Sequence, residues 1–140
     1  MKSIVVEGKT DSVVLQTLFP DMMEKEVSIR IAQGFSNVLA TSKTLIDYGY
    51  EVLAMLDTDS KMPGKDIREI VKRMQSSGVA GRTVDIVWMD SCIEDVLRKA
   101  NPVMFSKKAG GVSLKQAINK NKDALLALEE FKKIQEFING

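Results

Sequence analysis

Of all the features of this sequence, one uninterrupted apolar segment most limits the possible folds. Residues 52–56 have the sequence VLAML and lead directly into Asp57-Thr58-Asp59. An apolar run of this length without polar alternation is typical of a strand that is buried on both faces, as in the middle of a parallel sheet. We therefore expect an α/β fold built around this strand, with two aspartates at its carboxyl end.

Three more segments have the apolar, β-branched composition of strands, and helical patterns separate them. These three segments lie near residues 3–6, 27–31 and 83–88, and the central strand is taken as residues 51–56. Helical spacing of apolar residues is found in residues 14–19, 38–46, 67–74 and 93–97. Strands that alternate with helices predict a four-stranded parallel sheet with right-handed crossovers and helices on both faces, a Rossmann-like arrangement.

Serines are expected to begin two of these helices. Ser36 is a candidate N-cap for the helix that contains Val38. Ser91 and Glu94 have the spacing of a capping box, in which Glu94 would bond the Ser91 amide. The apolar pattern from residue 114 to residue 138 predicts one long helix or two short ones packed on the sheet.

The 140 residues correspond to about one domain. We assign residues 1–100 to the α/β domain and residues 101–140 to a helical extension packed on the same domain. No apolar run is long enough to span a bilayer, and the N-terminus, with Glu7 after three apolar residues, lacks the features of a secretory signal. We therefore expect a soluble protein without a membrane partner, and the lone Cys92 is compatible with a reducing cytoplasm.

The composition also excludes several kinds of chemistry. The sequence contains no histidine, which removes Ser-His-Asp and Cys-His nucleophiles and histidine-bound zinc. Hydrolytic chemistry would therefore depend on carboxylates, lysine or a hard metal ion. The net charge of +1 provides no overall attraction to polyanions, so contact with a nucleic acid would require local clusters of Lys and Arg.

Carboxylates follow two of the expected strands. Glu7 comes after the first strand, and Asp57 and Asp59 come after the third. The carboxyl ends of parallel strands lie at one edge of a sheet, where ligands of such folds gather. Oxygen-only ligands of this kind suit magnesium or manganese.

Two motifs around these carboxylates carry a resemblance to a known family. Residues 4–11, IVVEGKTD, resemble the glutamate motif of Toprim domains, an apolar strand followed by E-G-x-x-D, and residues 53–59, LAMLDTD, resemble the Toprim D-x-D motif. The motifs occur in the family's order, and the resemblance covers roughly residues 1–100. It implies a Toprim fold in which Glu7, Asp57 and Asp59 bind Mg²⁺ (or Mn²⁺) and assist in making or breaking phosphodiester bonds, with Glu7 also serving as general acid or base.

Further residues enter the predicted site through this resemblance. Residues 34–38 and 91–97 are similar to the Toprim domains of OLD-type nucleases, which implies Glu94 as an additional metal ligand. Within the glutamate motif, Asp11 is a candidate ligand and Lys9 a candidate contact to a substrate phosphate. Simpler roles stay open: Glu7 and Asp11 could cap the first helix, Glu94 could complete the capping box, and Lys9 could be a solvated lysine.

The leading functional hypothesis is a metal-dependent nuclease, or a related nucleotidyl or phosphoryl transferase, that processes or repairs DNA or acts on RNA. The alternative is a non-catalytic nucleic-acid or nucleotide-binding Toprim module. The sequence lacks the ATPase domain of OLD-type nucleases, so a partner protein could supply an ATPase or a further catalytic domain. Lysines 107, 108, 115, 120 and 122 could contact phosphates or simply be solvated. A receiver-like phosphoacceptor is disfavoured, because it needs an acidic pair after the first strand.

Overall fold

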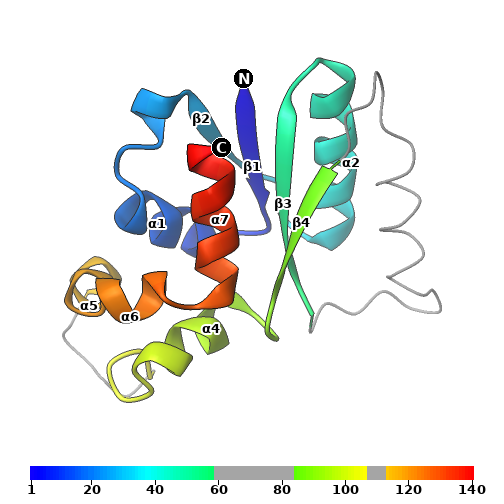
Figure 1. Ribbon diagram of the computed structural model, residues 1–140. Helices are drawn as coiled ribbons and strands as arrows, with labels where there is room; N and C mark the ends of the chain where they lie inside the picture. The colour runs from blue at the N-terminus through cyan, green and yellow to red at the C-terminus, as the bar shows by residue number, and fades with distance from the viewer. Residues whose placement is uncertain (59–83, 107–112) are drawn as a thin grey trace.

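The central element of the protein is a four-stranded, all-parallel β-sheet with the strand order β2-β1-β3-β4 (Figure 1). The computed structural model describes residues 1–58, 84–106 and 113–140. Its strands are β1 (Lys2–Val6), β2 (Val27–Ile31), β3 (Glu51–Asp57) and β4 (Val84–Met89). Each neighbouring pair is parallel. The predicted Rossmann-like α/β fold is confirmed.

Helices cover both faces of this sheet. The helix after β1 is α1 (Lys9–Leu18), followed by a 3-10 turn, η1 (Met23–Lys25), and α2 (Phe35–Asp47) comes after β2. The helices that follow β4 are α4 (Ile93–Ala100), α5 (Leu114–Lys120), α6 (Lys122–Leu126) and α7 (Glu129–Asn139). In Figure 1, α1 and α7 lie on one side of the strands and α2 on the other. We call these sides the α1 face and the α2 face.

The alternation of side chains along the strands divides the core into two layers. On the α1 face, Ile4 of β1 and Met55 of β3 belong to a cluster that also contains buried residues of α1 and α4–α7. On the α2 face, Val5 and Ala54 pack with apolar residues of α2. Residues 52–56 are all buried. The absence of polar residues in this segment is therefore explained by burial on both faces.

Two helices have N-cap residues other than the serines predicted from the sequence. The helix expected to be capped by Ser36 begins at Phe35, after Gly34, whose φ of 108° suits a residue without a Cβ. The helix after β4 begins at Ile93 with Cys92 at the N-cap position. Ser91 has a φ of 68°, whereas an N-cap residue normally has extended backbone. The predicted helix at residues 67–74 lies outside the described residues.

The C-terminal segment forms three helices, where one or two were expected. Asn121 interrupts the segment with φ −117° and ψ 19°, and its side-chain amide donates to the Ala117 carbonyl at 2.8 Å. Leu128 is extended and separates α6 from α7. Ile118, Leu125 and Phe131 are nevertheless buried in the same cluster as β1. In the described part of the chain, no helix has the length and apolar character needed to cross a membrane.

Candidate functional site

Glu7 and Asp57 lie next to each other at the carboxyl edge of the sheet. Strands β1 and β3 are hydrogen-bonded neighbours in register, with Ile4 opposite Leu53. Glu7 directly follows β1, and Asp57 is the last residue of β3. The Glu7 carboxylate (Oε2) accepts a hydrogen bond from the backbone N–H of Asp57 at 3.1 Å. The expected juxtaposition of these two residues is confirmed.

The pair is located where the winding direction of the sheet reverses. From β1 the chain crosses to β2 on one side, and it then returns past β1 to β3 on the other side. In open α/β sheets, this switch point leaves a crevice beyond the strand ends, and ligands bind there. The sheet topology therefore predicts a ligand site at the same position as the two sequence motifs, beyond the ends of β1 and β3.

Asp11 is buried in the first turn of α1, with 6% of its surface exposed. Its Oδ2 accepts a hydrogen bond from the Gly8 N–H at 2.9 Å, which confirms the capping interpretation for this residue. Burial, the largest cause, together with the charges of Glu94 and Glu7, raises the pKa of Asp11 to about 6, against the lowering effect of the Gly8 hydrogen bond. Two carboxylates that the sequence predicted for the site therefore affect the pKa of a third, Asp11.

Glu94 is exposed in the first turn of α4 and does not form the predicted capping box. Because the helix starts at Ile93, the residue three positions after its N-cap is Asp95 rather than Glu94. The Ser91 N–H donates to the Thr58 hydroxyl at 2.7 Å. The capping-box prediction for Glu94 is thus wrong, since the positive φ of Ser91 removes this residue from the N-cap position.

Asp95, rather than Glu94, bonds side chains at the start of α4. Its carboxylate accepts the Cys92 thiol, with Sγ 3.5 Å from Oδ2, and pairs with the Arg98 guanidinium at 2.6 Å. Hydrogen bonds from the Ser91 side chain and from Arg98 hold the pKa of Asp95 below its usual value. Asp95 is therefore occupied in stabilising the start of α4.

Thr58 was not identified from the sequence, but it ties the end of β3 to the end of β4. Its N–H donates to the Met89 carbonyl at 3.2 Å, and its hydroxyl accepts the Ser91 N–H. Thr58, which directly follows Asp57, is therefore fixed by hydrogen bonds of both its backbone and its side chain. The only signal in the sequence was a hydroxyl residue between the two aspartates, a position that the D-x-D pattern leaves open.

The lysines are less closely associated with this edge. Lys9 is exposed as the first residue of α1, and in the described part of the chain no carboxylate lies within 4.0 Å of its ammonium. Lys115 and Lys120 are exposed on α5. Asp59, Lys107 and Lys108 lie outside the described residues. Contacts of these lysines with phosphate stay a prediction.

The oxygen ligands at the switch point suit a hard divalent cation. Glu7 and Asp57 provide carboxylates only, which is the donor chemistry of magnesium and manganese sites. Among residues 1–58, 84–106 and 113–140, no three His, Cys, Asp or Glu side chains form a group that could hold a metal ion. The described residues thus provide a pair, and the third carboxylate of the predicted set, Asp59, lies outside them. The full ligand set stays a prediction.

No protein-family model matches this chain, and comparisons with curated proteins and with solved structures found no match. The resemblance to Toprim domains therefore depends on the two sequence motifs alone.

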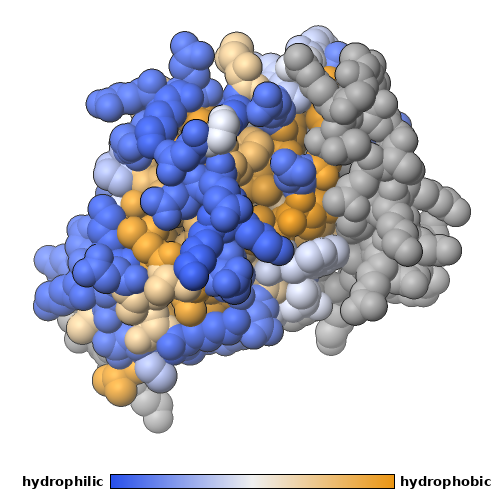
Figure 2. Space-filling model, in the orientation of Figure 1, coloured by the Kyte–Doolittle hydropathy of each residue, from blue (hydrophilic) through white to orange (hydrophobic). Residues whose placement is uncertain are grey.

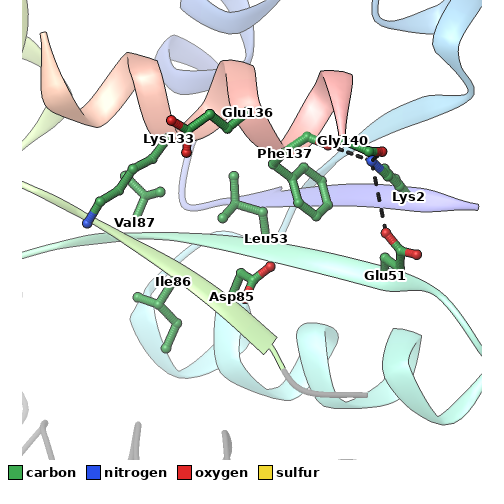
Figure 3. A pocket seen from close by; sticks show the side chains of 10 residues that line it. All are labelled: Lys2, Glu51, Leu53, Asp85, Ile86, Val87, Lys133, Glu136, Phe137 and Gly140. Atoms are coloured by element: carbon green, nitrogen blue, oxygen red, sulfur yellow. Dashed lines mark hydrogen bonds and ion pairs between the residues drawn. The ribbon is translucent and has the colours of Figure 1, made fainter. Parts of the chain in front are cut away.

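A separate pocket of about 500 Å³ lies at the opposite, amino-terminal edge of the sheet (Figure 3). Lys2, Glu51 and Asp85, near the starts of β1, β3 and β4, line it together with residues of α7. Figure 2 shows apolar side chains beside the polar surface of α7. Lys2 donates to the Phe137 carbonyl at 2.7 Å and is 4.0 Å from the Glu51 carboxylate. The pocket contains none of the predicted site residues, and its mixed charges indicate no particular ligand.

Proposed function

We propose that the protein carries out Mg²⁺- or Mn²⁺-dependent phosphoryl transfer at the switch point between β1 and β3, cleaving phosphodiester bonds in a nucleic acid. The observation that supports this most is the hydrogen bond between the Glu7 carboxylate and the Asp57 amide. It brings the two Toprim-like motifs together at the position where α/β sheets bind ligands. Nucleic acid as the substrate class comes from the resemblance of these motifs to Toprim domains.

In this proposal the metal ion is held by Glu7, Asp57 and Asp59. When bound, it neutralises charge on the scissile phosphate and lowers the pKa of water. The Asp57 amide orients the Glu7 carboxylate, so that Glu7 can accept or donate a proton at a defined position. Thr58 keeps the end of β3 attached to β4 and thereby positions Asp57.

Two further residues have supporting roles. Asp11, with a pKa of about 6, exchanges its proton near neutral pH and responds to charge placed beside Glu7. Lys9 is exposed at the start of α1, where its ammonium can neutralise a phosphate. We place the protein in the cytoplasm, since its single cysteine requires no oxidising compartment.

The test is incubation of the protein with single-stranded, duplex and structured DNA and RNA in Mg²⁺ or Mn²⁺. Cleavage by the wild type, no cleavage in EDTA and none by Glu7→Gln would support the proposal. Glu136→Gln, an exposed glutamate of α7 at the opposite edge, is the matched control and should cleave normally. Cleavage by Glu7→Gln at the wild-type rate would show that this site is not catalytic.

A second candidate is a non-catalytic nucleic-acid or nucleotide-binding module. Such a module would use the Glu7 and Asp57 carboxylates at the switch point for metal-dependent binding alone. A partner protein would then supply an ATPase or catalytic domain. Metal-dependent binding of nucleic acid without turnover would support this candidate over the first.

A further inference from the structure

Another pocket, of about 600 Å³, lies on the α2 face beside β2, the strand at one end of the strand order. Together with apolar residues of α2, it is lined by Arg30 of β2, by Thr41 and Thr44 of α2, and by Tyr48 and Tyr50. Both tyrosines of the sequence therefore line one pocket. Its described lining residues include no carboxylate, in contrast to the mixed charges of the pocket in Figure 3.

The C-terminal end of α2 fixes the two tyrosines. Between them, Gly49 has a φ of 89°, which suits a residue without a Cβ. The Gly49 N–H donates to the Ile46 carbonyl at 2.9 Å, and the Tyr50 N–H donates to the Leu45 carbonyl at 3.0 Å. These are the two hydrogen bonds of a Schellman motif. The backbone positions from which both tyrosine side chains extend are therefore defined by the helix end.

Arg30 provides the positive charge of this pocket. Its guanidinium lies over the Tyr50 ring, 5.9 Å from the ring centroid. In the described residues, no carboxylate lies within 4.0 Å of Arg30. A cation–π contact uses the face of the guanidinium and leaves its N–H donors for another partner. Those donors match the oxygens of a phosphate, with which arginine pairs bidentately.

The other side chains of the pocket offer a flat surface and hydrogen-bond acceptors. Tyr48 is 78% exposed, so its ring can stack with a planar group. The Thr44 hydroxyl donates to the Ala40 carbonyl at 3.0 Å, which leaves the lone pairs of its oxygen as acceptors. A ring for stacking, a guanidinium for phosphate and hydroxyls for the edge of a base are together the chemistry that binds a nucleotide.

We propose that this pocket binds one nucleotide unit of a single-stranded nucleic acid, with its base on Tyr48 and its phosphate on Arg30. The volume of about 600 Å³ is within the usual range of ligand pockets. Arg30 and Tyr48 are both exposed, so a strand can enter and leave the pocket, whereas a free nucleotide would be better held by an enclosed one. The choice of a strand rests on the proposed function, in which a nucleic acid is the substrate.

The position of the pocket relative to the switch point agrees with this direction of the strand. Tyr48 and Tyr50 precede the amino end of β3, whereas Arg30 is opposite Val5, two residues before Glu7. At the usual rise of a strand, this separation is about 7 Å along the sheet. A nucleic acid strand that passes from Tyr48 to Arg30 and continues in the same direction therefore approaches the carboxyl edge, where Glu7 and Asp57 lie.

Fluorescence anisotropy with labelled decamers of thymidylate and of uridylate, in EDTA, tests the binding. Arg30→Ala and Tyr48→Ala should each weaken it about tenfold, the usual size of one stacking or phosphate contact. Arg30→Ala should also make the slope of log affinity against log salt concentration less negative by roughly 0.7, because one phosphate contact is lost. Lys132→Ala is the matched control: it removes the same charge from an exposed position of α7, on the opposite face, and should bind like the wild type.

Nuclear magnetic resonance of protein labelled with carbon-13 in its tyrosine rings tests the location. Both tyrosines line this pocket, so every tyrosine signal reports on it, and Tyr48→Phe assigns the two rings. The decamers should shift the Tyr48 ring signals, and thymidine monophosphate should bind at least tenfold more weakly than the thymidylate decamer. Circular dichroism and thermal melting confirm that each variant is folded.

Unchanged tyrosine signals, or equal weakening by Arg30→Ala and Lys132→Ala, would overturn the inference. Equal affinity for thymidine monophosphate and the decamer would overturn the assignment to a strand and make the ligand a free nucleotide. Because binding is measured in EDTA, it does not depend on cleavage. Binding at the tyrosines without cleavage in Mg²⁺ would contradict the proposed function alone, and cleavage without binding at the tyrosines would contradict this inference alone.

Discussion

The Glu7 carboxylate accepts the backbone N–H of Asp57 at 3.1 Å, although 50 residues separate the two in the sequence. The bond connects the ends of two neighbouring strands, β1 and β3, directly at the switch point of the sheet. Any change in the Glu7 side chain therefore affects both the local chemistry and the position of Asp57.

Magnesium and manganese should stabilise the wild-type protein against thermal unfolding. A ligand that binds only the native state raises the free energy of unfolding in proportion to the logarithm of its concentration. Asp57→Asn removes one negative charge at nearly constant shape, so the metal-dependent shift in melting temperature should become much smaller. Asp85→Asn, an exposed aspartate at the opposite edge, should keep the full shift. Equal shifts for wild type and Asp57→Asn would place the metal elsewhere.

Glu7→Gln should lower the cleavage rate by about 100-fold or more, the usual effect of losing a general acid or base. The amide oxygen of the glutamine can still accept the Asp57 N–H, so the melting temperature of the metal-free protein should change little. Glu7→Ala also loses this acceptor and should cost about 1 kcal/mol of stability. Single-turnover kinetics together with thermal melting separate the two effects. A large loss of stability in Glu7→Gln would show that Glu7 acts mainly through structure.

Asp11→Asn should stabilise the metal-free protein at neutral pH. The pKa of Asp11 is raised from 3.8 to about 6 on folding, so the native state holds the proton more tightly than the unfolded state. Stability consequently falls as pH rises from about 4 to about 6, by about 3 kcal/mol for a shift of this size. An asparagine can still accept the Gly8 N–H but has no charge to bury.

Denaturant unfolding in EDTA, compared at pH 4 and pH 8, measures this effect. The advantage of Asp11→Asn over the wild type should be absent near pH 4 and fully developed at pH 8. Magnesium should reduce that advantage if the cation binds beside Glu7, because it offsets the repulsion between the carboxylates. A constant difference between the two proteins at all pH values would contradict the assignment.

Glu94→Gln should lower the pKa of Asp11, because the charge of Glu94 is one of the influences that raise it. The stability of the metal-free protein should not decrease, since Glu94 does not cap Ser91. Carbon-detected NMR titration of the Asp11 carboxyl reports the pKa, and calorimetry reports magnesium affinity. A loss of magnesium affinity in Glu94→Gln identifies Glu94 as a ligand. Unchanged affinity would mean that Glu94 affects only the pKa of Asp11.

Thr58→Val should destabilise the protein by about 1 kcal/mol, since it removes the hydroxyl that accepts the Ser91 N–H at 2.7 Å. Thr58→Ser keeps this acceptor and is the matched control. If this bond positions Asp57, Thr58→Val should also weaken metal binding, and by more than the loss of stability can explain. Hydrogen exchange at the Ser91 amide gives a direct readout: protection should fall in Thr58→Val and persist in Thr58→Ser.

Much of the fold could be predicted from local sequence patterns. The apolar run at residues 52–56 predicted a doubly buried strand, because polar residues are costly on either face of a central strand. The strands at residues 27–31 and 51–56 differ from β2 and β3 by at most one residue. Once the strands are parallel, their carboxyl ends share an edge, so the meeting of Glu7 and Asp57 also followed from the sequence.

Contacts between distant segments decided the rest. The backbone at Ser91 takes a positive φ, and its amide bonds Thr58 of another strand, so the capping box that the spacing predicted did not form. Asn121 ends α5 through its own side-chain bond and its contact with Asn101, which periodicity alone did not reveal.

The raised pKa of Asp11 illustrates the physical reason for this division. Strand and helix patterns express the preferences of neighbouring residues, and these can be read along the chain. Burial and the charges of Glu7 and Glu94 act through space, so their effect on the pKa of Asp11 exists only in the folded protein. The sequence by itself therefore determined the sheet, its apolar layers and the candidate residues at its carboxyl edge, whereas the tertiary structure decided the hydrogen bonds of those residues and the pKa of Asp11.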